Sequence, residues 1–108
     1  MANQISNCFA ALADPTRRAV IEQLATRPQS VKKLAAHHAM ALPTFMRHLQ
    51  VLHDCGLIRS EKTGRVRTCH LEPHALLEVQ GWLAWQREIW ERQQDKRDQI
   101  PMELGGEN

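Results

Sequence analysis

Residues 41–58 constrain the fold most, because they combine an amphipathic helix with an abrupt end. The stretch reads ALPTFMRHLQVLHDCGLI. Three apolar residues fall on one helical face: Phe45, Leu49 and Leu52. Cys55 ends this apolar stripe, and Gly56 is placed as a C-terminal cap. The sequence therefore predicts a short, half-polar helix at 42–55 that stops before the next segment begins.

A basic hairpin follows this helix directly. Residues 57–71 read LIRSEKTGRVRTCHL, in which two short runs with strand character flank residues 62–65. A Thr-Gly pair at that place suits the tip of a β-hairpin. A helix that stops at a glycine and leads into a basic hairpin is typical of a winged helix-turn-helix. The recognition helix would then be 42–55 and the wing 58–70.

The first third of the chain predicts three helices. Four apolar residues keep i, i+3, i+4, i+7 spacing and indicate a short helix at the start: Ile5, Cys8, Phe9 and Leu12. Asp14 and Pro15 are a favourable cap and first residue for a second helix, which ends near Thr26 because Pro28 follows. Ser30 can cap a third, shorter helix.

Pro73 begins a last and longer helix with a broad apolar stripe. The predicted fold class is mainly α with a small β-hairpin. A chain of 108 residues suits one compact domain, and we place a single winged helix-turn-helix domain at residues 1–98. Residues 99–108 contain turn formers and little else, so we expect a disordered tail there.

The charges are segregated along the chain, although the net charge is only +2. Residues 1–41 carry five basic and two acidic groups, and residues 42–71 carry five and two again. Residues 72–108 carry four basic and eight acidic groups. An excess of cations in the first two-thirds of a chain is typical of a part that binds a polyanion, but scattered and solvated Lys and Arg would give the same charge.

The outer face of the predicted recognition helix has the groups needed to read DNA. Six residues lie opposite its apolar face: Leu42, Pro43, Thr44, Met46, Arg47 and Gln50. Arg47 can pair bidentately with guanine or bind a phosphate, and Thr44 can bond to either. His48 lies beside this face. In the hairpin, four residues are expected to contact the DNA backbone: Lys62, Thr63, Arg65 and Arg67.

Three stretches together resemble the ArsR/SmtB family of winged-helix repressors. They are FAALADPTRRAVIEQLA, VKKLA and LPTFMRHLQVLHDCGLIRSEKTGRVRTCHL, and the resemblance covers about residues 5–97. It implies a homodimer that binds a double-stranded DNA operator of two-fold character. The first and last helices, about 3–13 and 73–97, would form the dimer. The resemblance also implies an effector that weakens DNA binding, which the sequence does not identify.

The chain departs from the metal-sensing members of that family. Those members carry a Cys-x-Cys pair before the recognition helix, where this chain has Ser30-Val31-Lys32. Hydroxyl and ammonium groups cannot replace two thiolates around a soft metal. Other members bind metal on the last helix. There Glu72 and His74 match the first pair loosely, but the later positions fall near Trp85 and Glu88, and tryptophan is not a ligand. We therefore expect no metal and no cofactor.

The three cysteines are odd in number and show no Cys-x-x-Cys spacing, which favours reduced thiols in a cytoplasmic protein. Cys8 and Cys55 lie on apolar stripes and are most simply core residues. The alternative is a repressor that responds to thiol oxidation or to a soft metal through Cys8, Cys55 or Cys69. That alternative requires accessible thiolates of low pKa. His37 and His38 are interpreted as an exposed helix end.

The last helix carries more aromatic surface than a single helix can leave in water. Its three tryptophans lie within nine residues, and Gly81 would let another helix approach beside Trp82. We therefore predict a dimer interface formed by nine residues: Ile5, Phe9, Leu76, Val79, Trp82, Leu83, Gln86, Ile89 and Trp90.

Two other classes of function were weighed against a DNA-binding regulator. A winged-helix module that binds proteins without reading DNA remains a further alternative, although the basic wing argues against it. An enzyme is not expected, because the sequence has no Gly-rich phosphate loop, no paired carboxylates and no nucleophile with a histidine and an acid in order. No stretch approaches the roughly 20 apolar residues of a membrane span.

Overall fold

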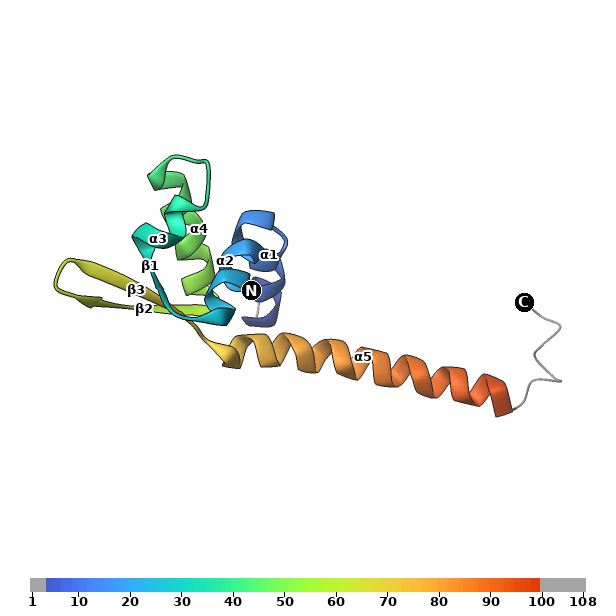
Figure 1. The fold of residues 1–108 in the computed structure, drawn as a ribbon. Helices are drawn as coiled ribbons and strands as arrows, with labels where there is room; N and C mark the ends of the chain where they lie inside the picture. The colour runs from blue at the N-terminus through green and yellow to red at the C-terminus, as the bar shows by residue number, and fades with distance from the viewer. Residues whose placement is uncertain (1–3, 100–108) are drawn as a thin grey trace.

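The fold was analysed in a computed structural model that describes residues 4–99, with side chains through residue 96. The helices are α1 (Gln4–Leu12), α2 (Pro15–Thr26), α3 (Val31–Ala36), α4 (Leu42–Asp54) and α5 (Pro73–Gln99). The strands are β1 (Gln29–Ser30), β2 (Ile58–Thr63) and β3 (Val66–Leu71). Helices α1 to α4 form a cluster, and the β2–β3 hairpin and α5 leave it in opposite directions (Figure 1). This is the predicted winged helix-turn-helix.

The predicted helix boundaries are confirmed at the caps. The Asp14 carboxylate accepts a hydrogen bond from the backbone N–H of Arg17 at 3.0 Å and begins α2. The Ser30 hydroxyl accepts from the backbone N–H of Lys33 at 3.1 Å and begins α3. Gly56 follows α4 with a φ of 82°, a left-handed conformation in which a side chain would be strained.

The hairpin has the predicted tip and one strand that was not predicted. Thr63 pairs with Val66, so Gly64 and Arg65 form a two-residue turn, and Gly64 has a φ of 63°. The sheet has three antiparallel strands in the order β1-β3-β2. β1 has only two residues, which is too short for any alternating pattern, and it becomes a strand because β3 lies beside it.

One core holds the helices and the sheet together. Its most deeply buried large side chains are Val20, Leu34, Phe45, Leu52 and Leu57, together with Cys8, Cys55 and Cys69. The predicted inward face of α4 is confirmed, since Phe45, Leu49 and Leu52 are all buried. This packing fixes which face of α4 points away from the domain.

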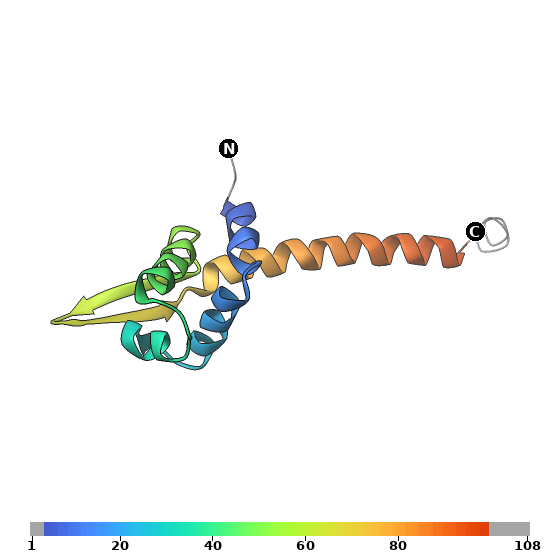
Figure 2. The same ribbon diagram turned by 90° about the horizontal axis from the view of Figure 1, so that it is seen from above.

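Helix α5 is only partly packed on this core. Ala75 and Val79, in its first two turns, belong to the core, whereas most of the helix extends away from the domain (Figures 1 and 2). The protomer is accordingly long and narrow, with extents of 69 × 31 × 25 Å. Within the described residues, even this helix is not apolar enough to span a bilayer.

The end of α5 differs slightly from the prediction. The helix includes Gln99, which was assigned to the tail, so the last helix is longer than its apolar stripe suggested. Helix ends are the least certain part of any pattern, since fraying shifts them by one or two residues. The rest of the predicted disordered tail, 100–108, lies outside the described residues, as does the start of the chain, 1–3.

Candidate nucleic-acid interface

The outer face of α4 is open to solvent over its whole length. All six residues predicted for this face are exposed: Leu42, Pro43, Thr44, Met46, Arg47 and Gln50. Leu42 is 57 % exposed, and Met46, one turn later, is 38 % exposed. The first acidic residue of the helix is Asp54 at its end, where its carboxylate accepts a hydrogen bond from the Gln50 amide at 2.7 Å. A DNA phosphate would therefore be repelled less by the N-terminal half of α4 than by its C-terminal end, where the Asp54 carboxylate lies.

The N-terminus of α4 favours an anion. Ala41 occupies the cap position, and no side chain caps the helix. The N–H groups of a first helical turn have no partner within the helix, and they carry the positive end of the helix dipole. They are consequently available to a DNA phosphate.

The wing has free cations at its tip and neutralised charge at its base. At the base, Arg59 Nε lies 3.0 Å from Glu72 Oε1, and Arg59 Nη1 lies 3.7 Å from Glu61 Oε1. Lys62, Thr63, Arg65 and Arg67 are all exposed. Among the described residues, Lys62, Arg65 and Arg67 form no ion pair. The charge of the tip is therefore not compensated within the protomer.

A groove runs between α4 and the wing and joins the two predicted DNA-binding elements. Its volume is about 280 Å³, and its lining residues are Val31, Met46, Leu49, Gln50, His53, Ile58, Ser60, Arg67 and Cys69. Arg67 Nη1 donates to Ser60 Oγ at 3.2 Å, which holds the guanidinium across the hairpin. Four of the lining residues are polar and lie between the two predicted DNA-binding elements: Gln50, His53, Ser60 and Arg67.

The groove includes two polar residues that the sequence analysis missed, His53 and Ser60. His53 lies four residues after Leu49 and seven after Met46, so helical spacing alone places it on the same flank of α4. Ser60 faces Cys69 across the hairpin, and only the strand register shows this. The angle at which the hairpin meets the helix is a tertiary feature without a local pattern.

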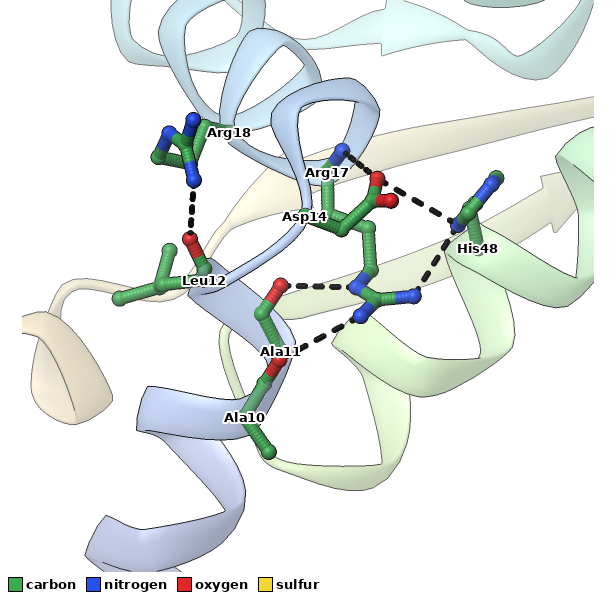
Figure 3. A network of polar contacts seen from close by, with 7 residues as sticks. All are labelled: Ala10, Ala11, Leu12, Asp14, Arg17, Arg18 and His48. Carbon is green, nitrogen blue, oxygen red and sulfur yellow. Dashed lines mark hydrogen bonds and ion pairs between the residues drawn. The ribbon is translucent and has the colours of Figure 1, made fainter.

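His48 does not lie on the outer face of α4. Its ring turns towards the start of α2, where Nδ1 lies 3.1 Å from Arg17 Nη1 and 3.8 Å from Asp14 Oδ2 (Figure 3). His48 was expected beside the DNA-facing residues, and its ring instead contacts Arg17 and Asp14, because position 48 lies at the edge of the buried face, next to Phe45 and Leu52.

His37 and His38 behave differently from each other. His37 is exposed, as predicted, but His38 is half-buried and stacks on Phe45, with ring centroids 5.1 Å apart. His38 Nε2 also lies 3.2 Å from Gln23 Oε1. Burial lowers the pKa of His38 below its usual value, and His37 and His48 lower it further. The residue therefore serves as a neutral packing group between α2 and α4.

The residues that loosely matched a metal site on α5 are occupied with other partners. Glu72 pairs with Arg59, and His74 Nε2 lies 3.4 Å from Glu78 Oε1 on the same helix. Within residues 4–96, no three His, Cys, Asp or Glu side chains are grouped so that they could hold a metal ion.

The three thiols are buried inside the protomer. Cys8 Sγ donates to the backbone oxygen of Cys55 at 3.4 Å, and Cys55 Sγ donates to that of Leu52 at 3.3 Å. Burial raises the pKa of the Cys8 thiol to about 11, and neighbouring Cys55 adds to the effect. Burial also raises the pKa of Cys69. A thiol sensor needs the opposite environment, so this geometry argues against that alternative.

We expect all three thiols of the native protein to react slowly with iodoacetamide at pH 7.5. Burial blocks access to all three, and the raised pKa of Cys8 and Cys69 leaves those two thiols almost no thiolate at that pH. Labelling followed by mass spectrometry should show modification only at the rate at which the chain opens, with full labelling in denaturant. Fast native labelling of any cysteine, accompanied by loss of DNA binding, would restore the sensor hypothesis.

The exposed part of α5 carries most of the residues predicted to form a dimer. Beyond Val79, four large apolar side chains of the predicted interface are exposed: Trp82, Leu83, Ile89 and Trp90. Phe9 of α1 lies edge-on to Trp82, with ring centroids 5.4 Å apart. Three predicted interface residues also take part in the protomer's own packing, since Val79 is 7 % exposed and Ile5 and Leu76 are partly buried against the core.

Several known proteins are similar to this chain in sequence and in fold. A helix-turn-helix domain family matches residues 12–61. The crystal structure of the ArsR family transcriptional regulator RHA00566 superposes with a TM-score of 0.80 at 50 % sequence identity, and the match covers 82 % of this chain and 98 % of that one.

Two curated relatives are also regulators. The HTH-type transcriptional regulator Rv2034 of Mycobacterium tuberculosis is 39 % identical over 66 residues, which are 61 % of this chain and 62 % of that protein. The transcriptional repressor SdpR of Bacillus subtilis is 25 % identical over 79 residues, which are 73 % of this chain and 88 % of that protein. The match thus spans somewhat less than two-thirds of the mycobacterial relative.

Proposed function

Because the chain belongs to the ArsR family of transcriptional regulators, we propose that it is a homodimeric repressor that binds a specific, two-fold-symmetric DNA operator in the cytoplasm. α4 enters the major groove, and the β2–β3 wing lies along the backbone. One observation carries this proposal. The outer face of α4 and the basic side chains of the wing are exposed together, and a groove lies between the two elements.

Within α4, base reading is assigned to the residues nearest its N-terminus. Arg47 is exposed and forms no ion pair within the described residues, so its guanidinium is free to pair with a guanine edge. Thr44 lies one turn earlier and offers a hydroxyl and a methyl group. The other predicted contacts, Leu42, Pro43, Met46 and Gln50, supply apolar and amide surface on the same face.

The dimer is proposed from the apolar side chains that α5 leaves in water. Trp82, Leu83, Ile89 and Trp90 extend the buried face of Val79 along the part of α5 that projects away from the domain. A contiguous apolar surface of this kind is costly to leave exposed. A second copy covers it with the same surface, and the two recognition helices then meet successive major grooves about 34 Å apart.

The proposal assigns repression to the state without a bound ligand. The cysteines are buried, and within the described part of the chain no cluster of side chains could hold a metal ion, so neither a thiol switch nor a metal is part of the proposal, which names no effector. No catalytic role is proposed, since the relatives named above are described as regulators.

The proposal is tested by fluorescence anisotropy on the DNA upstream of the protein's own gene, with scrambled DNA of equal length as the control. We expect tighter binding to the upstream DNA at every salt concentration, and a steep loss of affinity for both duplexes as salt increases. Equal, salt-insensitive binding of both duplexes would contradict the proposal and favour the protein-interaction module.

Substitution of the wing cations should weaken binding to all DNA alike. Lys62→Ala and Arg65→Ala each remove one phosphate-contacting charge per protomer, so upstream and scrambled DNA should lose affinity by the same factor. The slope of log affinity against log salt should decrease by roughly two for the dimer, about one for each lost contact. Glu61→Gln, a neighbouring wing substitution that removes an acid instead, is the control and should not decrease the slope. An unchanged slope in both alanine variants would remove the wing from the interface.

A further inference from the structure

Arg17 links three elements through one side chain. Its Nε donates to the backbone oxygen of Ala11 at 2.7 Å, and its Nη2 donates to that of Ala10 at 3.3 Å. Its remaining terminal nitrogen, Nη1, lies 3.1 Å from His48 Nδ1 on α4 (Figure 3). The guanidinium thus connects the C-terminal end of α1 with the middle of the recognition helix, while its own backbone N–H is held by Asp14.

The contacts with α1 have a simple electrostatic reason. The last four carbonyl groups of a helix have no partner within the helix, and they carry the negative end of its dipole. Arg17 binds the carbonyls of Ala10 and Ala11, and Arg18 Nη1 donates to that of Leu12 at 2.8 Å. Both arginines therefore cap α1, but only Arg17 also reaches α4.

The contact with His48 fixes the state of the imidazole. Asp14 Oδ2 also lies near Nδ1 and would favour a proton there, but at 3.8 Å it is farther away than Arg17 Nη1 at 3.1 Å. A guanidinium has hydrogen-bond donors and no acceptor, so the closer contact requires His48 Nδ1 to accept. The neutral ring then carries its proton on Nε2. A proton on Nδ1 would place two donors opposite each other at 3.1 Å and break the contact.

We infer that Arg17 is a positioning residue for DNA recognition, which holds α4 at a fixed angle to α1 through the unprotonated Nδ1 of His48. The inference rests on the proposed function. It assigns no DNA contact to either residue. α1 also carries Phe9, which packs on Trp82 of α5, so the same arginine joins the recognition helix to the elements proposed to form the dimer.

The inference predicts a pattern of operator affinities among four single variants. Arg17→Lys keeps the charge but loses the planar fork, and His48→Phe keeps the ring but loses the acceptor. Each should lower operator affinity roughly tenfold, the order expected for a lost hydrogen bond to a charged group. His48→Gln retains an acceptor and should bind like the wild type. Arg18→Lys is the matched control, since Arg18 touches α1 alone, and it should also bind like the wild type.

The double variant Arg17→Lys/His48→Phe shows whether the two residues act on operator affinity through one shared contact or independently of each other. If both residues act through one contact, the double variant binds no more weakly than either single variant. Additive losses, or an Arg17→Lys variant that binds like the wild type, would overturn the inference. A wild-type protein without preference for the upstream DNA would instead overturn the proposed function, and the inference with it.

A measurement on the wild type alone checks the chemistry even if a variant fails to fold. Long-range ¹H–¹⁵N NMR spectra of the imidazole at pH 7.5 distinguish a protonated from an unprotonated ring nitrogen. We expect the His48 ring to carry its proton on Nε2 and an acceptor lone pair on Nδ1. A proton on Nδ1 at that pH would overturn the inference.

Discussion

Leu83→Glu is expected to convert the protein into a monomer and to lower its operator affinity by roughly a hundredfold or more. Leu83 is 52 % exposed in the protomer, so the substitution leaves the core intact. In a two-fold dimer the substitution would bring two carboxylates into an apolar contact, where an unpaired charge is strongly unfavourable. A monomer holds only one half-site and loses the gain that comes from linking two binding events.

Leu77→Glu provides the matched control on the same helix. Leu77 is 60 % exposed, but it lies on a different side of α5 from the stripe that continues the buried face of Val79. We expect this variant to remain a dimer by sedimentation velocity and to retain operator affinity. A dimeric Leu83→Glu variant would contradict the proposed interface, and loss of the dimer in both variants would show that the interface surrounds the helix.

Arg47→Ala is expected to have the second large effect, and it should act on specificity. A bidentate arginine–guanine pair contributes about 1–3 kcal/mol of discrimination, and a dimer contains two copies. The operator should therefore lose much more affinity than scrambled DNA. Base preference should relax at one position in each half-site, which competition with single-base operator variants would reveal.

Arg59→Ala is the charge-matched control for Arg47→Ala. Arg59 is exposed, but it pairs with Glu72 at the base of the wing. Its removal takes away one cation per protomer without taking away a base contact, so any loss should be small and equal for both duplexes. If Arg47→Ala leaves the ratio of operator to scrambled affinity unchanged, α4 does not read bases through that residue.

Local patterns predicted much of this fold, because each feature has a short-range cause. The helical spacing of Phe45, Leu49 and Leu52 fixes the buried face of α4 and, with it, the exposed one. Asp14 and Gly56 mark helix ends by their own chemistry. The face that α4 presents to solvent therefore follows from the sequence alone.

The features that were missed depend on contacts between distant segments. Residues 17 and 48 are 31 positions apart, and no spacing rule predicts that their side chains meet. The strand β1 exists only because β3 lies beside it. The apolar stripe of α5 is continuous in sequence, and only the packing of the domain shows that Val79 is covered within the protomer while Leu83 is exposed.

Selection of binding sites from a library of random DNA duplexes tests the central claim most directly, because it assumes no operator. The wild-type protein is incubated with the library at physiological salt, and the bound duplexes are amplified and sequenced over several rounds. The account predicts enrichment of an inverted repeat whose half-sites lie one helical turn apart, about 10 base pairs from centre to centre. A library that remains random in sequence, or an enriched site without two-fold symmetry, would contradict it.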